Sequence, residues 1–153
     1  WLLSHDKVKS ICNIAHGEGF GLPMFEAAQN AIPVITVGWS GQLDFLYHNG
    51  KNYFADVEYS LQTIQQEAHW NGVLEPDSQW AFADKHSYQK TCRNVYKNYD
   101  KWKLLADDLK TIIFEKHDPD LIHERFVSSV VGDIDFSDES WMKEIEGIIN
   151  EYE

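Results

Sequence analysis

Short apolar runs alternate with glycine-containing segments in the N-terminal part of the chain. Val8–Ala15 and Val34–Val37 are apolar and contain β-branched side chains, which predicts two buried strands. Tyr53–Ala55 predicts a third strand. Between the strands, Met24–Ala31 has a helical composition, and Gln42–Tyr47 predicts a short helix. The order strand, helix, strand, helix, strand is typical of a parallel α/β unit.

The rest of the chain is predicted to be mostly helical. Residues 56–84 have no clear period, and we expect a helix there followed by an irregular aromatic loop. Three helices are expected after it, over residues 87–99, 101–116 and 119–130, with Asp100 and Asp118 as caps. A last helix is expected from Ser137 or Asp138 through Asn150. The sequence thus predicts one domain over residues 1–131, then a linker and C-terminal helix over residues 132–153.

Composition narrows the classes of partner. The chain has 153 residues, of which 43% are hydrophobic, so it is expected to fold as a globular protein. Its net charge of −12 argues against nucleic acid and against broad attraction to an anionic membrane surface. A single anionic ligand stays compatible with this charge, because backbone N–H groups at a helix start hold phosphate without any cationic side chain.

The cysteines favour a reducing compartment. Cys12 and Cys92 form no Cys-x-x-Cys pair and no disulfide framework, and Cys12 is predicted to be a buried free thiol. The sequence has no signal peptide and no apolar run of membrane-spanning length. We therefore expect a cytoplasmic protein, with peripheral attachment to a membrane as the alternative location.

The most informative segment runs from Glu18 to Ala28 and reads EGFGLPMFEAA. It holds two carboxylates eight positions apart, Glu18 in a loop after a strand and Glu26 in the first turns of the next helix. In open α/β sheets, ligands bind outside the carboxyl ends of the strands. Glycine amides and the helix start suit a phosphate there, and the two carboxylates suit sugar hydroxyls. Each glutamate taken alone also fits an ordinary surface position, but glycines, proline and both acids agree at one place.

This segment resembles the Glu-x7-Glu motif of the retaining GT-B glycosyltransferases of family four. The family pattern is a strand, then Glu-Gly-Phe-Gly-Leu-Pro, a helix with Glu-Ala, and Pro-Val-Ile, all present from Glu18 to Ile35. The likeness covers residues 8–54. It implies the second half of a Rossmann-like C-terminal donor-binding domain, in which three parallel strands with helices are followed by C-terminal helices.

The resemblance also implies a role for each residue of the segment. Glu26 would bind the ribose hydroxyls of a nucleoside-diphosphate sugar, and Glu18 would lie beside the transferred sugar as the catalytic residue. The other donor-binding residues implied are Gly19, Phe20, Gly21 and Leu22, with Gly41 as a further amide donor and His16 either touching the sugar or only packing. The expected reaction is sugar transfer to an acceptor hydroxyl with retention of configuration.

Two features depart from the family pattern. His16 stands where the family often has a small polar residue, and the second loop reads Ser40-Gly41-Gln42-Leu43-Asp44 instead of Gly-Gly-x-x-Glu. Sugar and nucleotide selectivity therefore stay open. Two alternatives stay open as well: a non-catalytic module that binds a nucleotide sugar, and another GT-B enzyme such as a phosphorylase or an epimerase.

The resemblance carries expectations about partners. The three strands would correspond to strands four, five and six of a full domain. Earlier strands, the basic residues that neutralise the diphosphate, and a domain binding a glycan, lipid or protein acceptor would then precede Trp1. Residues 8–15 would become an apolar sheet edge, so we expect an isolated chain to be inactive and to form homo-oligomers through this strand or another uncovered apolar face.

Other motifs are weaker. No carboxylate cluster or metal-ligand spacing of histidines is evident, so no divalent metal and no cofactor are expected. Asp118-Pro119-Asp120 fits a helix cap better than a metal site. The spacing of Gly17, Gly19 and Gly21 does not fit a dinucleotide loop. Four aromatic side chains are expected to form a local core and not a surface that binds carbohydrate. They are Trp70, Trp80, Phe82 and Tyr88.

Overall fold

The computed structural model describes residues 2–131 of the chain. They fall into a compact unit that ends at Lys116 and a second unit that begins at His117. The predicted division at residues 131 and 132 and the predicted last helix through Asn150 lie at or beyond the end of the described residues. The first unit contains the sheet and every predicted site residue.

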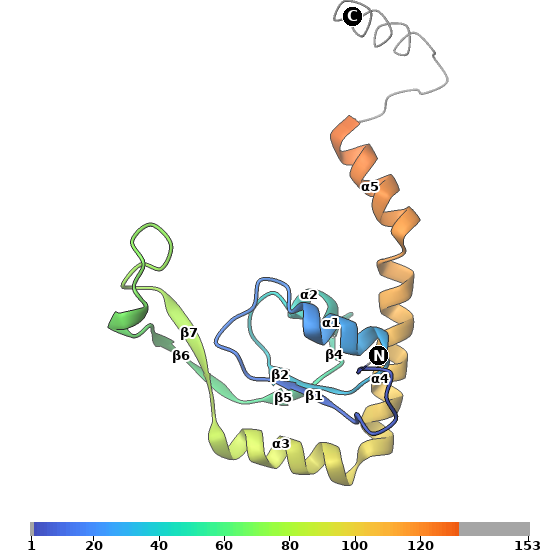
Figure 1. Ribbon diagram of the computed structural model, residues 1–153, viewed down its shortest axis with the longest axis horizontal. Helices are drawn as coiled ribbons and strands as arrows, with labels where there is room; N and C mark the ends of the chain where they lie inside the picture. Colours follow the sequence, from blue (N-terminus) through green and yellow to red (C-terminus); the bar gives the residue numbers. More distant parts are fainter. Residues whose placement is uncertain (1, 132–153) are drawn as a thin grey trace, which may run out of the picture. The chain divides into compact units, whose positions relative to one another are not determined.

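A three-stranded parallel sheet forms the centre of the first unit (Figure 1). Its order is β1 (Ile11–Asn13), β2 (Val34–Val37) and β5 (Ala55–Val57), with Cys12 opposite Ile35 and Thr36 opposite Asp56. The parallel α/β arrangement predicted from the hydrophobic pattern is therefore confirmed. The middle strand has the predicted bounds, β1 is shorter than predicted, and β5 begins two residues later.

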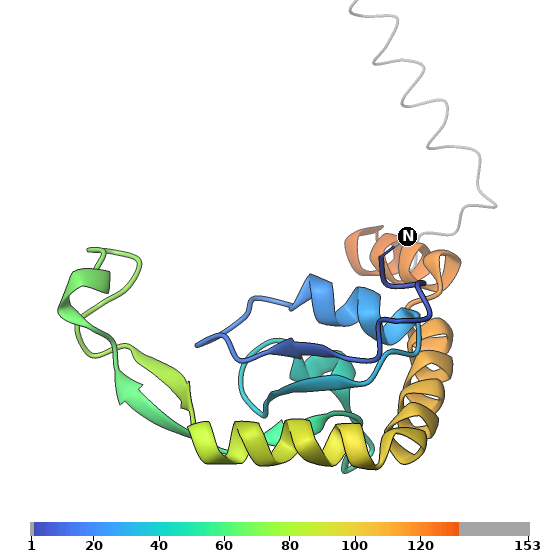
Figure 2. The ribbon, with the colours of Figure 1, turned by 60° about the horizontal axis from the view of Figure 1, so that its bottom comes forward.

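Helices cover both faces of this sheet. On one face lie α1 (Leu22–Gln29) and the short α2 (Leu43–Leu46), whose apolar side chains share one core with Val34. α4 (Tyr99–Lys116) contributes Leu109 and Ile113 to this core and Trp102 to the core on the other face. On the other face, α3 (Lys85–Lys97) packs through Val95 against the side chains of β2 and β5. Figure 2 shows the sheet between α1 and α3. Two apolar layers therefore fix the sheet and leave its carboxyl edge for the connecting loops.

Residues 56–84 differ most from the prediction. They form a β-hairpin and no α-helix: β6 (Tyr59–Thr63) pairs antiparallel with β7 (Gln79–Ala83), and the tip contains a 3₁₀ turn at Gln66–Ala68. All five residues of β6 are exposed, so the strand lacks the apolar face by which strands are recognised in a sequence. The hairpin projects away from the central sheet (Figure 2).

The turns and caps follow local chemistry. A small hairpin of β3 (Tyr47–His48) and β4 (Lys51–Asn52) turns through Asn49 and Gly50, both at positive φ, as expected for a tight two-residue turn. Asp118 caps α5 (Pro119–Val131) by accepting from the N–H groups of Asp120 and Leu121, so the predicted cap is confirmed.

Two smaller predictions are wrong. Asp100 was predicted to precede α4, but it lies inside the first turn of this helix, which begins at Tyr99. The aspartate that does cap a helix in this region is Asp84, at the start of α3. Cys12 is exposed, because β1 pairs with β2 alone among the described strands and α3 covers its outer side only in part. Among residues 2–131, no helix combines the length and apolar character needed to cross a bilayer.

Candidate site at the carboxyl edge of the sheet

The backbone of Glu18 is bound to the loop that follows β2. Its N–H donates to Ser40 Oγ at 2.9 Å, and its carbonyl oxygen accepts from Ser40 Oγ at 2.6 Å and from Gly41 N–H at 3.0 Å. Ser40 adopts φ 82°, an unfavourable conformation for a residue with a side chain. Ser40 therefore keeps a strained backbone conformation, which the hydrogen bonds between its hydroxyl group and the Glu18 backbone hold in place.

Asn13 orients the side chain of Glu18. Its Nδ2 donates to Glu18 Oε1 at 2.7 Å, and its Oδ1 accepts from Ala15 N–H at 2.9 Å. Both ends of the amide are thus occupied, which fixes its orientation and supplies a donor to the partly buried carboxylate. Sequence reasoning missed Asn13, although its position at the end of a predicted strand beside a glycine-rich loop was a usable signal.

Gly41 is required by the close approach of the two loops. A β-carbon at this position would lie 1.9 Å from the carbonyl oxygen of Gly19, whereas one at Gly19 would meet nothing within 4 Å. The Gly41 amide, expected to face a phosphate, donates to Glu18 in this structure. Gly41 therefore allows the two loops to pack directly against each other.

The start of α1 depends on Gly21. This residue has φ 86°, and its carbonyl oxygen accepts from the N–H groups of Met24 and Phe25 at 2.9 and 3.0 Å. Phe20 packs against Phe25 and Phe45 at ring distances of 5.1 Å, which attaches the loop to α1 and α2. Leu22 is the first residue of the helix and is exposed. The loop and the helix start form one packed unit.

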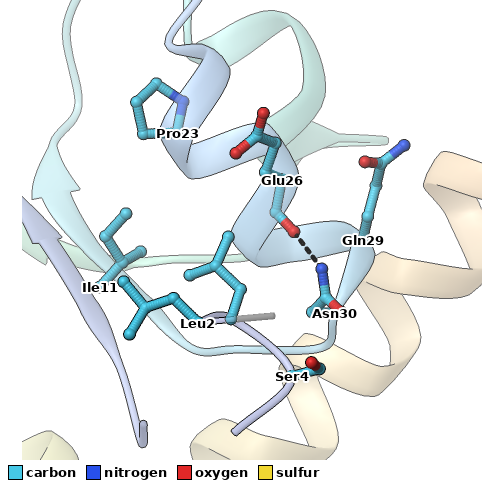
Figure 3. A pocket seen from close by; sticks show the side chains of 8 residues that line it. Leu2, Ser4, Ile11, Pro23, Glu26, Gln29 and Asn30 are labelled. Atoms are coloured by element: carbon cyan, nitrogen blue, oxygen red, sulfur yellow. Dashed lines mark hydrogen bonds between the residues drawn. The ribbon is translucent and has the colours of Figure 1, made fainter.

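Glu26 lies on the exposed side of α1 and lines a pocket of about 490 Å³. Figure 3 shows Glu26 and Gln29 on the helix, with Leu2 and Ile11 on the opposite side of the pocket. Asn30 Nδ2 donates to the Glu26 carbonyl oxygen at 2.8 Å, and the Glu26 carboxylate lies at the pocket rim. The pocket combines an apolar wall with the polar side chains of Ser4, Glu26, Gln29 and Asn30.

His16 joins the hairpin to the Glu18 loop. Its carbonyl oxygen accepts from Ala81 N–H at 3.0 Å, and its Nδ1 lies 2.8 Å from the Ala81 carbonyl oxygen. Because a carbonyl only accepts, Nδ1 carries the hydrogen. The imidazole stacks parallel to Trp80, at 5.0 Å and 3°, and contacts Phe82 at 4.4 Å.

The loop after β2 has further contacts with β5 and the hairpin. Tyr59 Oη donates to the Gly38 carbonyl oxygen at 3.2 Å. The carboxylate of Asp56 lies so close to Gly38 that a β-carbon there would be 3.3 Å from Oδ1. Desolvation at this contact raises the pKa of Asp56, partly offset by hydrogen bonds from the Gly38 and Val57 amides.

A group of sulfur and hydroxyl side chains lies on the α3 side of the sheet. The hydrogen bond to Cys12, more than any other contact, raises the pKa of Tyr88 to about 12. Although Cys12 is exposed to solvent on one side, partial desolvation raises the pKa of its thiol, so the thiol form is favoured near neutral pH. Cys12 and Cys92 are both free cysteines.

The predicted residues form two groups in the structure. One comprises His16, Glu18, Gly19 and Gly41 at the contact of the two loops; the other comprises Phe20, Gly21, Leu22 and Glu26, in and before α1. Within residues 2–131, no cluster of three or more His, Cys, Asp or Glu side chains is arranged to hold a metal ion. Comparison of the chain with protein-family models, with curated proteins and with solved structures finds no match.

Proposed function

We propose that this chain binds the nucleoside-diphosphate sugar of a retaining GT-B glycosyltransferase, with a Rossmann-like half-domain as its scaffold. The observation that carries the proposal is a loop at the carboxyl edge of a parallel sheet that holds Glu18 and leads directly into the helix carrying Glu26. Glu18 is fixed by Asn13 and Ser40, and Glu26 lines an open pocket on the helix that begins immediately after the same loop. Ligands of open α/β sheets bind at this edge.

The pocket beside Glu26 suits the nucleoside. Leu2 and Ile11 offer apolar surface to a base, and the exposed carboxylate of Glu26 offers charged acceptors to two vicinal ribose hydroxyls. Pro23 has no N–H, and the Met24 and Phe25 amides already donate to Gly21. A diphosphate at this helix start would therefore bind through the amides of Phe20, Gly21 and Leu22.

The transferred sugar would lie beside Glu18. In a retaining transfer, the bond from the anomeric carbon to the diphosphate breaks and a bond to the acceptor oxygen forms on the same face. The acceptor proton leaves with the diphosphate. Positive charge develops on the sugar ring, and a carboxylate fixed in advance stabilises it without reorganisation. The hydrogen bond from Asn13 is the structural basis for this role of Glu18.

Metal-free transfer belongs to the same proposal. Amides at the helix start take the place of a cation on the diphosphate, so binding of the nucleotide is expected to persist in EDTA. A homo-oligomer formed through β1 stays a prediction, which light scattering on the chain will test. A dimer or larger species is expected, and a monomer at all concentrations would exclude it.

Calorimetry of the full chain with nucleoside diphosphates and their sugars tests the proposal. We expect at least one nucleotide to bind, and its sugar conjugate to bind at the same site in competition. Release of the nucleotide from the conjugate then separates a transferase or other GT-B enzyme from a non-catalytic binding module. Absence of binding for uridine, guanosine, adenosine, cytidine and thymidine diphosphates would contradict the proposed function.

A further inference from the structure

The β6–β7 hairpin carries an aromatic surface directly beside the Glu18 loop. Every second side chain of a strand points to the same face, so Trp80 and Phe82 lie on the same face of β7. The pairing places Gln62 opposite Trp80 and Ser60 opposite Phe82. The imidazole of His16 stacks on Trp80 and makes a tilted contact with Phe82, and these four residues and His16 form what we call the aromatic face of the hairpin.

This face borders a pocket of about 370 Å³. Its lining includes one aromatic ring of the face together with a hydroxyl, an amide, two carboxylates and one ammonium group, from Phe82, Ser60, Gln62, Glu58, Asp84 and Lys85. Gln62 Nε2 donates to Ser60 Oγ at 2.8 Å, so the two polar groups are held side by side. The volume is within the range of about 300–1,000 Å³ typical of ligand sites.

The chemistry of the lining favours an uncharged, hydroxyl-rich ligand with an apolar side. Two carboxylates against one ammonium group disfavour a phosphate or another anion. Hydroxyl, amide and carboxylate groups match sugar hydroxyls as donors and acceptors. The ring of Phe82 provides a flat apolar surface in this pocket for the C–H groups of a pyranose, and Trp80 lies beside it on the same face of β7. A wholly apolar ligand would leave these polar groups without partners, which costs binding energy.

Hydrogen bonds connect the aromatic face of the hairpin to the loop that contains Glu18. His16 precedes Glu18 by two residues, and both its backbone and its ring are bonded to Ala81 of β7. Tyr59, at the start of β6, donates to the carbonyl oxygen of Gly38. Gly38 belongs to the loop after β2, whose Ser40 is hydrogen-bonded to the backbone of Glu18. The aromatic face is thus attached at its base to both loops of the candidate site.

We infer that the aromatic face of the hairpin is a pyranose-binding subsite adjoining Glu18. The inference rests on the proposed function for its link to transfer, but sugar binding by this face is measurable without it. The sugar bound here belongs either to the acceptor or to the donor. The two sources share the same recognition chemistry and differ in whether the sugar must be attached to a nucleotide.

Nuclear magnetic resonance of the ¹⁵N-labelled full chain tests the subsite. The chain has six tryptophans, and the indole N–H signal of Trp80 is assigned from a Trp80→Phe variant. The probes are the methyl α- and β-glycosides of glucose, mannose, galactose and N-acetylglucosamine, with and without saturating nucleoside diphosphate, and the nucleotide sugars of the same four sugars. We expect at least one probe to shift the Trp80 signal. Shift by a free glycoside assigns an acceptor sugar; shift by a nucleotide sugar alone assigns the donor sugar.

Two variants separate binding at this face from non-specific contact. Gln62→Ala, at an exposed position of β6, is expected to weaken sugar binding about three- to tenfold, the effect of one hydrogen bond. Trp70→Ala is the matched control, because Trp70 is 67% exposed at the hairpin tip, away from the aromatic face. Equal effects of the two variants, or no shift of Trp80 with any glycoside or nucleotide sugar, would overturn the inference. Nucleoside diphosphate binding near Leu2 and Ile11, followed in the same spectra, reports separately on the proposed function.

Discussion

Glu18 and Glu26 belong to one short motif but have opposite environments. Glu18 is partly buried, with its carboxylate bound to Asn13 and its backbone bound to the loop after β2. Glu26 is exposed on α1 at the rim of an open pocket. A side chain that is already fixed is suited to stabilising charge that appears during a reaction, whereas an exposed one is suited to binding groups that arrive with a ligand. The difference predicts separable effects of changes at the two sites.

The largest effect on stability is expected where the two loops touch. Gly41→Ala introduces a β-carbon 1.9 Å from Gly19 O, so the loops must separate and the contacts that hold Glu18 are lost. We expect the free energy of unfolding to fall by about 1–3 kcal/mol, as for other overpacked positions. Gly19→Ala is the control, with an expected change within about 0.5 kcal/mol. Urea unfolding of both variants measures this, and equal losses would show that the contact is not tight.

The next effect concerns chemistry alone. Glu18→Gln keeps the shape of the side chain but removes the charge that faces the developing oxocarbenium ion. In an enzyme that joins this chain to the expected acceptor domain, release of nucleoside diphosphate from a bound nucleotide sugar is expected to slow by about two orders of magnitude or more. A single-turnover assay with the nucleotide sugar detects the change. An unaltered rate would mean that Glu18 has a purely structural role.

Asn13 provides a smaller and more specific test. Asn13→Asp keeps an oxygen for the Ala15 amide but replaces the donor to Glu18 with a second carboxylate oxygen. We expect the Glu18 side chain to turn away and turnover, measured together with the expected acceptor domain, to fall roughly ten- to hundredfold, the effect of one hydrogen bond to a charged group. Asn52→Asp, at an exposed position of β4, makes the same chemical change elsewhere. Equal rates for the Asn13→Asp and Asn52→Asp variants would show that Asn13 does not contribute to the function of Glu18.

The smallest effect concerns Asp56, at the same edge of the sheet. Desolvation raises its pKa above the ordinary value of 3.8, so the folded state binds the proton more tightly than the unfolded state. Its contribution to stability is therefore complete below pH 3.8 and lost as the pH rises through the folded-state pKa. Asp56→Asn should gain stability relative to the unsubstituted chain over that rise. A difference in urea midpoints that stays constant from pH 3.5 to 7 would contradict this.

The sequence was most informative where one local signal decided the structure. Val34–Val37 is buried on both faces because it is the middle strand, and it was predicted with its observed bounds. Gly21 and Pro23 likewise marked the start of α1. The hairpin was missed because all residues of β6 are exposed, so no alternating pattern distinguishes it from a loop. Its attachment depends on His16, which lies far from β7 in the sequence.

The candidate site was predicted in part, for a related reason. The motif from Glu18 to Glu26 was read from consecutive residues, whereas Asn13 and Ser40 act through contacts that exist only after folding. The expected local aromatic core was wrong for Trp70, which is 67% exposed, while Tyr88 packs on the α3 side of the sheet. Trp80 and Phe82 stack instead on His16. Aromatic content alone does not tell which surface a ring will cover.

Calorimetric titration of one nucleoside diphosphate into three proteins tests the different roles of the two glutamates most directly. The proteins are the unsubstituted chain, Glu26→Ala and Glu18→Gln. Loss of a hydrogen bond to a charged group is worth about 1.5–3 kcal/mol, so Glu26→Ala is expected to weaken nucleotide binding roughly ten- to hundredfold. Glu18→Gln is expected to leave it unchanged, because the proposed function places the sugar, and not the nucleoside, beside Glu18. Equal losses in both variants, or unchanged affinity in Glu26→Ala, would contradict the account.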